Sequence, residues 1–194
     1  MGTKEDAAEK VLEEAAEVFG SWQHWAEYAP LSACHERGFP QCNCPYTSTC
    51  DTHQHPESMD TTLEQLADEI ADCIQACANL AARYDLPSPH IDVPRVVRSD
   101  KTLALSPLFA AAHVLCDWEI LNDAIKSDEH DDFSRTYIDS EKETIGEDIE
   151  SCIAACITLA RLFDIDLAAA MARCEERNRL RGRYEKKSED VESA

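Results

Sequence analysis

Apolar side chains recur every three or four positions along several long segments of the chain, and this spacing places them on one face of an α-helix. The clearest segment begins near Thr61, and its apolar seam consists of Leu63, Leu66, Ile70, Cys73, Cys77, Leu80 and Tyr84. A first segment runs from Thr3 to about Glu27, and its apolar face consists of Val11, Ala15, Val18 and Trp22. We therefore expect an all-α protein built as a helical bundle.

Three further helices are expected in the second half of the chain. One should begin at Ser106-Pro107, because serine is a good helix cap and proline is favoured at the first helical position. Another should begin near Ser140, and the last should run from Asp166 to about Arg181. Together with the two segments above, the pattern predicts five helices.

The second half of the chain repeats the seam of the first half. The segment Cys73-Ile74-Gln75-Ala76-Cys77 aligns with Cys152-Ile153-Ala154-Ala155-Cys156. We interpret this likeness as an internal repeat, with residues 1–86 as the first copy and residues 102–183 as a degenerate second copy. The remaining segments are a proline-rich loop at 29–60, a proline-rich linker at 87–101 and a charged tail at 184–194.

Two acidic clusters lie beside these seams: Glu13-Glu14-Ala15-Ala16-Glu17 (EExxE) and Glu69-Ile70-Ala71-Asp72 (ExxD). Residues three apart on a helix share a face, so each cluster points its acids one way. If the helices pack, the carboxylates meet, and such a group is tolerable mainly around a hard divalent cation that prefers oxygen ligands. An acidic cluster in an acidic protein is ordinarily a solvated helix face. The pairing of the two clusters beside a seam favours a magnesium site.

The second copy has lost most of these acids. The equivalent positions carry Asp148 for Glu69, Ser151 for Asp72 and Ile120 for Glu17. A shifted group made of Asp117, Glu147 and Glu150 leaves a degenerate second site as an alternative, although Ile120 removes one partner. We expect the second copy to lack a full metal site.

The charge of the chain excludes two classes of partner. Acidic residues outnumber basic ones by 39 to 18, which gives a formal charge of -21. This excess repels nucleic-acid phosphates and anionic membranes, so we expect no nucleic-acid polymer and no membrane as a partner. No apolar run approaches the roughly 18–20 residues that cross a bilayer, and the N-terminus is charged rather than signal-like. The sequence therefore predicts a cytoplasmic protein.

Ten cysteines divide into groups with different expected roles. Those in the seams, Cys73, Cys77, Cys152 and Cys156, are expected to be small buried apolar residues rather than metal ligands. Those in the loop, Cys34, Cys42, Cys44 and Cys50, lie near His35, His53 and His55. They offer enough soft ligands for a structural zinc that would order a loop poor in apolar side chains. Free thiols or a disulfide framework are the alternatives for this loop.

The acidic motifs carry a resemblance to a known family. EExxE, then ExxD, then Asn79-Leu80-Ala81 seven residues after Asp72 resemble the MazG-like branch of the all-α nucleoside triphosphate pyrophosphohydrolases, relatives of the dimeric dUTPases. The resemblance covers about residues 7–26 and 63–85. The segment 165–171, followed by Asn178 and Arg181, is similar to the terminal helix of that family. The loop from Cys34 to His55 departs from the family pattern.

The resemblance implies an activity and the residues that carry it. Members of the family hold magnesium, which manganese can replace, and cleave a nucleoside triphosphate into a monophosphate and pyrophosphate. By resemblance, Glu14, Glu17, Glu69 and Asp72 would be the metal ligands, and Glu13 would orient or activate the attacking water. A non-catalytic protein that senses or sequesters nucleotides with the same pocket is the alternative function.

Residues near the acids are candidates to hold the nucleotide. Lys10 lies one turn before the EExxE motif, and Asn79 and Arg83 follow the ExxD motif on the same polar stripe. Trp22 and Trp25 could stack on the base, although tryptophans on an amphipathic helix are ordinarily core or interface residues.

Basic residues gather near the end of the chain: Arg173, Arg177, Arg179, Arg181, Arg183, Lys186 and Lys187. They could bind phosphate, or they could simply be a solvated helix end that balances the helix dipole. Family members complete their sites across a dimer, so the repeat implies a fused pseudo-dimer that brings Arg179, Arg181 and Arg183 near the triphosphate. Whether two chains also form a homodimer is left open.

Overall fold

The computed structural model describes residues 5–36, 55–86, 100–126 and 132–181. All regular secondary structure in these ranges is helical, which confirms the all-α expectation. The helices are α1 (Glu5–Glu36), α2 (His55–Tyr84), α3 (Asp100–Lys126), α4 (Asp132–Leu162) and α5 (Leu167–Leu180).

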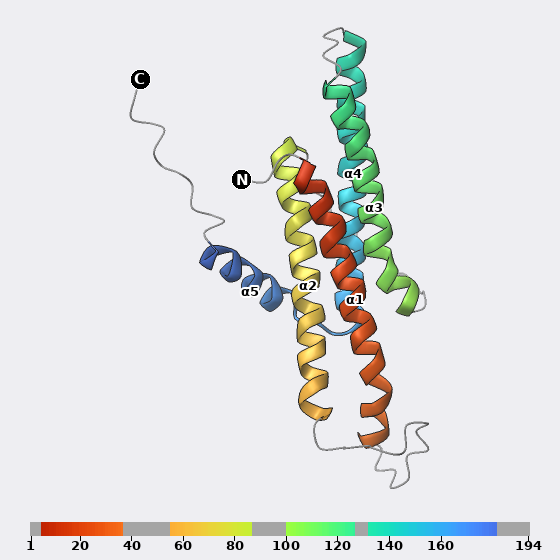
Figure 1. Ribbon diagram of the computed structural model, residues 1–194, viewed down its shortest axis with the longest axis vertical. Helices are drawn as coiled ribbons and strands as arrows, with labels where there is room; N and C mark the ends of the chain where they lie inside the picture. The colour runs from red at the N-terminus through yellow and green to blue at the C-terminus, as the bar shows by residue number, and fades with distance from the viewer. Residues whose placement is uncertain (1–4, 37–54, 87–99, 127–131, 182–194) are drawn as a thin grey trace.

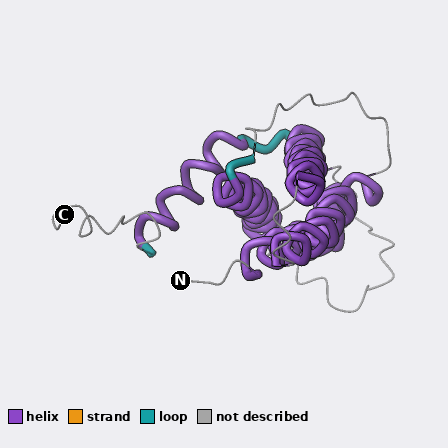
Figure 2. Tube along the Cα trace, turned by 90° about the horizontal axis from the view of Figure 1, so that it is seen from above, coloured by secondary structure: helices purple, strands orange, loops and turns teal. Residues whose placement is uncertain are grey.

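The four long helices form a bundle (Figure 1). Helix α1 packs along α2 and helix α3 packs along α4, while contacts between α1 and α3 and between α2 and α4 join the two pairs. The short helix α5 packs against α2 and projects away from the bundle, as the view from above shows (Figure 2). Helix α2 therefore contacts α1, α4 and α5, and it is the element on which the site described below depends.

The interior of the bundle is filled by the seams that the periodicity predicts. The fully buried positions of α2 are Leu66, Ile70, Cys73, Cys77 and Leu80. Those of α4 are Ile145, Ile149, Cys152, Cys156 and Leu159, each at most 1% exposed. Leu63 and Tyr84, at the ends of the predicted seam of α2, are partly buried against the same core. The apolar spacing thus identified the inward face of both helices.

Helix α3 begins at Asp100, ahead of the predicted start at Ser106. Pro107 lies inside the helix, and the Ser106 hydroxyl donates to the Thr102 carbonyl over 2.9 Å instead of capping a helix. The extra turn buries Leu103 and Ala104 in the core, and this burial offsets the hydrogen bond that proline cannot make. The predicted cap at Ser106-Pro107 is therefore wrong.

Other helices also extend beyond their predicted limits. Helix α1 continues past Glu27 to Glu36, α2 begins at His55 rather than Thr61, and α4 begins at Asp132 rather than Ser140. Of the loop expected at 29–60, residues 29–36 belong to α1 and residues 55–60 belong to α2, while residues 37–54 lie outside the described residues. Helix α5 matches its prediction, because the Asp166 side chain accepts a hydrogen bond of 3.0 Å from the Ala169 amide and caps the helix.

Helix α3 is also more apolar than we expected. From Thr102 to Lys126 it is long and apolar enough to cross a bilayer by length and composition, with a mean hydropathy of 1.3. The expectation that no run reaches this length is therefore wrong for α3. In the bundle its inner face, which includes Val114 and Leu121, is buried, whereas Phe109 on the outside is 63% exposed.

Candidate metal centre

Three carboxylates from two helices meet where α1 packs along α2. Each of Glu14, Glu69 and Asp72 offers one oxygen, and these oxygens lie within 4.8 Å of one another. Glu14 is only 7% exposed, and the other two are half-buried. Oxygens that share one magnesium ion are about 3–4 Å apart, since each lies about 2.1 Å from the ion. The predicted carboxylates therefore come together with nearly the spacing that a single ion requires.

Burial and crowding raise the pKa values of two of these carboxylates, Glu14 and Glu69. Loss of hydration, together with the negative charges of Glu17, Asp72 and Glu14, raises the pKa of Glu69 to about 7. Burial also raises the pKa of Glu14, although the ammonium group of Lys10 opposes this shift. Near neutral pH the cluster is thus ready to exchange a proton for a cation, because either one relieves the repulsion.

Glu17, the fourth expected ligand, lies beside the other three. Its proximity contributes to the raised pKa values of Glu14 and Glu69. Glu13 is placed differently: its side chain is 59% exposed and its carboxylate pairs with the Lys10 ammonium over 3.1 Å. Lys10 also binds Glu14 over 2.7 Å, so it pairs with both adjacent glutamates at the start of the EExxE motif.

The carboxylates form one wall of a cavity of about 750 Å³. This volume lies within the range of roughly 300–1,000 Å³ that is usual for small-molecule sites. The cavity is lined by Ala7, Lys10, Glu14, Glu17, Glu69, Asp72, Gln75, Ala76, Asn79, Arg83, Asn178 and Arg181. The predicted residues Lys10, Asn79 and Arg83 are therefore on its wall, and Gln75 donates to Asn79 over 3.0 Å.

Helix α5 is attached to α2 by ion pairs that reach the metal site. The Arg177 guanidinium binds Asp68 and Asp72 with one nitrogen each, both over 2.8 Å. Arg173 binds Asp68 as well, over 2.7 Å. Sequence reasoning placed Arg177 in the basic stretch but missed this contact. Asp68 and Asp72 are spaced four apart on one helix, like Arg173 and Arg177 on the other, but this spacing does not show that the two pairs lie opposite each other.

Helix α5 also contributes to the cavity wall. Asn178 is buried and donates to the Cys174 sulfur over 3.4 Å, and Arg181 ends the helix at the cavity. Of the arginines expected near a triphosphate, Arg181 is in position, whereas Arg179 pairs with its neighbour Glu176 over 2.6 Å on the exposed side. Arg183 lies outside the described residues.

The two tryptophans do not line this cavity. The ring of Trp22 stacks on Phe19 with centroids 5.7 Å apart, and Trp25 packs edge-on against Phe163 at 4.5 Å. Their stacking on a base stays a prediction. The loop residues cannot be placed, because Cys42, Cys44 and Cys50 lie outside the described residues and the side chain of Cys34 is not described.

The second copy holds a smaller acidic group. Burial and a hydrogen bond with Asp117 raise the pKa of Asp148 to about 6, while the charge of His113 opposes the shift. Asp117 and Asp148 thus lie close together, with Glu147 also near Asp148. Within the described ranges, the groups of three or more metal-ligating side chains are Glu14, Glu69 and Asp72 in one place and Cys73, Cys152 and Cys156 in another.

Comparison of the chain with protein-family models, with curated proteins and with solved structures finds no match. The site is therefore interpreted from its own geometry and from the sequence motifs.

Proposed function

We propose that the protein is a magnesium-dependent nucleoside triphosphate pyrophosphohydrolase that releases a nucleoside monophosphate and pyrophosphate. The observation that carries the proposal is the meeting of Glu14, Glu69 and Asp72, with Glu17 beside them, on the wall of a cavity that also contains cationic side chains. The resemblance of the EExxE and ExxD motifs to the MazG-like family supplies the reaction.

The donor set fits magnesium, because all its atoms are carboxylate oxygens, and the pairing of Glu14 with Lys10 and of Asp72 with Arg177 offsets only part of their mutual repulsion. When bound, magnesium would neutralise charge on the phosphate oxygens and on the leaving pyrophosphate. Glu14, Glu69 and Asp72 would hold it, with Glu17 as the fourth ligand. In solution manganese should replace magnesium, since it accepts the same ligands.

The chain itself would position the triphosphate and accept a proton. Lys10, Arg83 and Arg181 bring positive charge to the same cavity as the carboxylates, so phosphate oxygens can be held against the ion. Water attacks the α-phosphorus, the bond to the bridging oxygen breaks, and pyrophosphate leaves with the electron pair. A glutamate of the EExxE motif accepts the proton of the water. The family resemblance assigns this step to Glu13, whereas Glu17 is the one that lines the cavity.

We also propose that the bundle is a fused pseudo-dimer of the MazG-like type. Three facts support a duplication: the aligned seams, the pairing of α1 with α2 and of α3 with α4, and the replacement of Glu14 and Glu69 by Asp117 and Asp148, which also touch. In this interpretation the first copy keeps the metal site, and the second copy contributes packing.

A panel of nucleotides with magnesium, scored for pyrophosphate against orthophosphate, tests the activity. We expect pyrophosphate, and we expect Glu69→Gln to remove turnover while Glu64→Gln, an exposed glutamate on the same helix, retains it. Orthophosphate as the product would refute the proposed bond cleavage. Magnesium-dependent binding without turnover would support the alternative function of nucleotide sensing or sequestration.

A further inference from the structure

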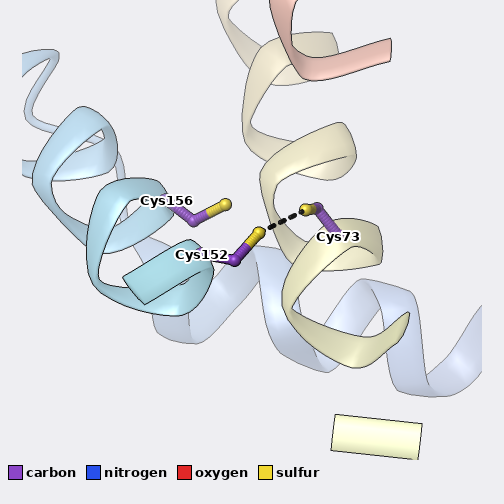
Figure 3. Close-up of side chains that lie close together, drawn as sticks. All are labelled: Cys73, Cys152 and Cys156. Carbon is purple, nitrogen blue, oxygen red and sulfur yellow. Dashed lines mark hydrogen bonds between the residues drawn. The ribbon is translucent and has the colours of Figure 1, made fainter. Parts of the chain in front are cut away.

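Four buried thiols meet in the middle of the bundle, away from the cavity described above. Cys73 and Cys77 come from α2, Cys152 and Cys156 come from α4, and none of the four has exposed surface. The sulfurs of Cys73, Cys152 and Cys156 point toward one another across the helix interface (Figure 3). These three sulfurs lie within 4.8 Å of one another. Cys77 lies one helical turn after Cys73 on the same buried face of α2.

The sequence alone suggested that these cysteines are ordinary small core residues. That role explains why each is buried, but it does not explain why their sulfurs converge on one point. Each helix contributes two cysteines four residues apart, and such a pair presents both sulfurs on one face. Because the two pairs face each other, the convergence depends on the registration of α2 against α4, which the spacing within either helix does not determine.

The spacing of the sulfurs matches metal coordination. Zinc lies about 2.3 Å from each thiolate in a tetrahedral site, so neighbouring sulfurs are about 3.8 Å apart. The sulfurs of Cys73 and Cys152 are 3.9 Å apart. A disulfide requires a sulfur separation of about 2.0 Å, so the two sulfurs as they lie are too far apart for one. The sulfurs of Cys73 and Cys152 therefore already lie at the edge length of a tetrahedron around a single ion, and the sulfur of Cys156 lies within 4.8 Å of both.

We propose that Cys73, Cys77, Cys152 and Cys156 form a buried tetrathiolate site for one soft metal ion, with zinc as the ion that fits the tetrahedral geometry. All four ligands are sulfur, and this selects thiophilic ions such as zinc or cuprous copper over magnesium. Binding releases thiol protons to solvent and places the ion among the thiolates. The site is separate from the carboxylate site and does not depend on the proposed activity.

The ion would connect the two halves of the chain. Helices α2 and α4 belong to different copies of the proposed repeat, and the four sulfurs lie at the contact between them. A metal ion bound by sulfurs of both helices would fix the rotation of α2 about its own axis relative to α4. Since Asp72 immediately precedes Cys73, the same rotation turns the acidic face of α2 toward α1 and the cavity. The site is therefore structural, with its ion closed off from solvent.

The test uses the full chain with Cys34, Cys42, Cys44 and Cys50 all changed to serine, so that the loop cannot hold metal. This variant, reduced and free of metal, is titrated with cobalt, whose visible absorption is intense in a tetrahedral thiolate site, and then with zinc. We expect about one ion per chain, displacement of cobalt by zinc, and a sulfur shell at about 2.3 Å in X-ray absorption. Elemental analysis after purification from cells distinguishes zinc from copper as the resident ion.

Two further variants in the same background locate the ligands. Cys152→Ser should lose the bound ion and the cobalt spectrum, whereas Cys116→Ser, which changes an exposed cysteine outside the cluster, should keep both. If Cys152→Ser fails to fold, the titration of the loop variant still decides the question. Two results would overturn the proposal: no bound cobalt, zinc or copper in the reduced and folded loop variant, or a disulfide between Cys73 and Cys152 in metal-free protein.

Discussion

Changing Glu69 to glutamine should stabilise the metal-free protein at alkaline pH while it removes the proposed activity. The substitution keeps the size of the side chain and deletes its charge. Burial and the neighbouring carboxylates raise the pKa of Glu69 from 4.5 to about 7, so the folded state holds the proton more tightly than the unfolded state. The stability from this proton is fully present below pH 4.5 and is lost as the pH rises through about 7.

The magnitude follows from the size of the shift. A difference of 2.5 pKa units, from 4.5 to about 7, corresponds to about 3.4 kcal/mol at most, at about 1.36 kcal/mol per unit. Glu69 is partly exposed, and solvent screening reduces the figure, so we expect about 1–2 kcal/mol. For a chain of this size, that gain corresponds to a rise in Tm of roughly 2–8 °C.

Thermal unfolding between pH 4.5 and pH 8, with and without magnesium, measures the effect. Without magnesium, the advantage of Glu69→Gln over the wild type should be smallest near pH 4.5 and largest at pH 8. With magnesium at pH 8, the wild type should gain stability and the variant should gain little, because it has lost a ligand. Glu64→Gln serves as the control and should follow the wild type. A glutamine variant that is no more stable than the wild type at pH 8 without metal would refute the reasoning.

Three other results are expected. Arg177→Ala should lower the free energy of unfolding by about 1–3 kcal/mol and speed hydrogen exchange in α5. The control Arg179→Ala breaks an exposed pair and should change the free energy of unfolding by less than about 0.5 kcal/mol. Equal effects of the two substitutions would contradict the assigned role of Arg177. Glu17→Gln should reduce the stabilisation of the protein by magnesium. Glu13→Gln should retain that stabilisation and lose turnover. A Glu13→Gln variant with normal turnover would assign the role of proton acceptor to Glu17. Serine at the four loop cysteines should lower the zinc content by about one ion per chain, as measured by elemental analysis, and an unchanged content would exclude the loop site.

The buried faces, and the shared face of the acidic residues within each motif, could be predicted from the sequence because both follow from local helix geometry. Leu66, Ile70 and Leu80 had to share a face, and so did Glu69 and Asp72, whatever surrounded them. The limits of the helices could not be predicted in the same way. Ser106-Pro107 is a start signal locally, but burial of Leu103 extends α3 ahead of it. Tertiary packing decides such positions.

Contacts between helices that are far apart in the sequence could not be predicted either. The bridge from Arg177 to Asp72 and the meeting of Cys73 with Cys152 depend on how α5 and α4 are rotated and shifted against α2. Helical spacing determines which residues share a face, but not which face of another helix lies opposite. The seam cysteines were therefore expected to be buried, which is confirmed, while their convergence became visible only in the folded chain.

The double ion pair of Arg177 ties the position of α5 to the charge of the carboxylate site. Asp72 serves two partners, since its Oδ1 atom accepts from Arg177 while the carboxylate belongs to the proposed ligand set. A divalent ion on Asp72 withdraws negative charge from the arginine, so each weakens the other by the same free energy. Metal binding and release of α5 are then reciprocal events, and the helix that bears Asn178 and Arg181 becomes a reporter of whether the site holds its ion.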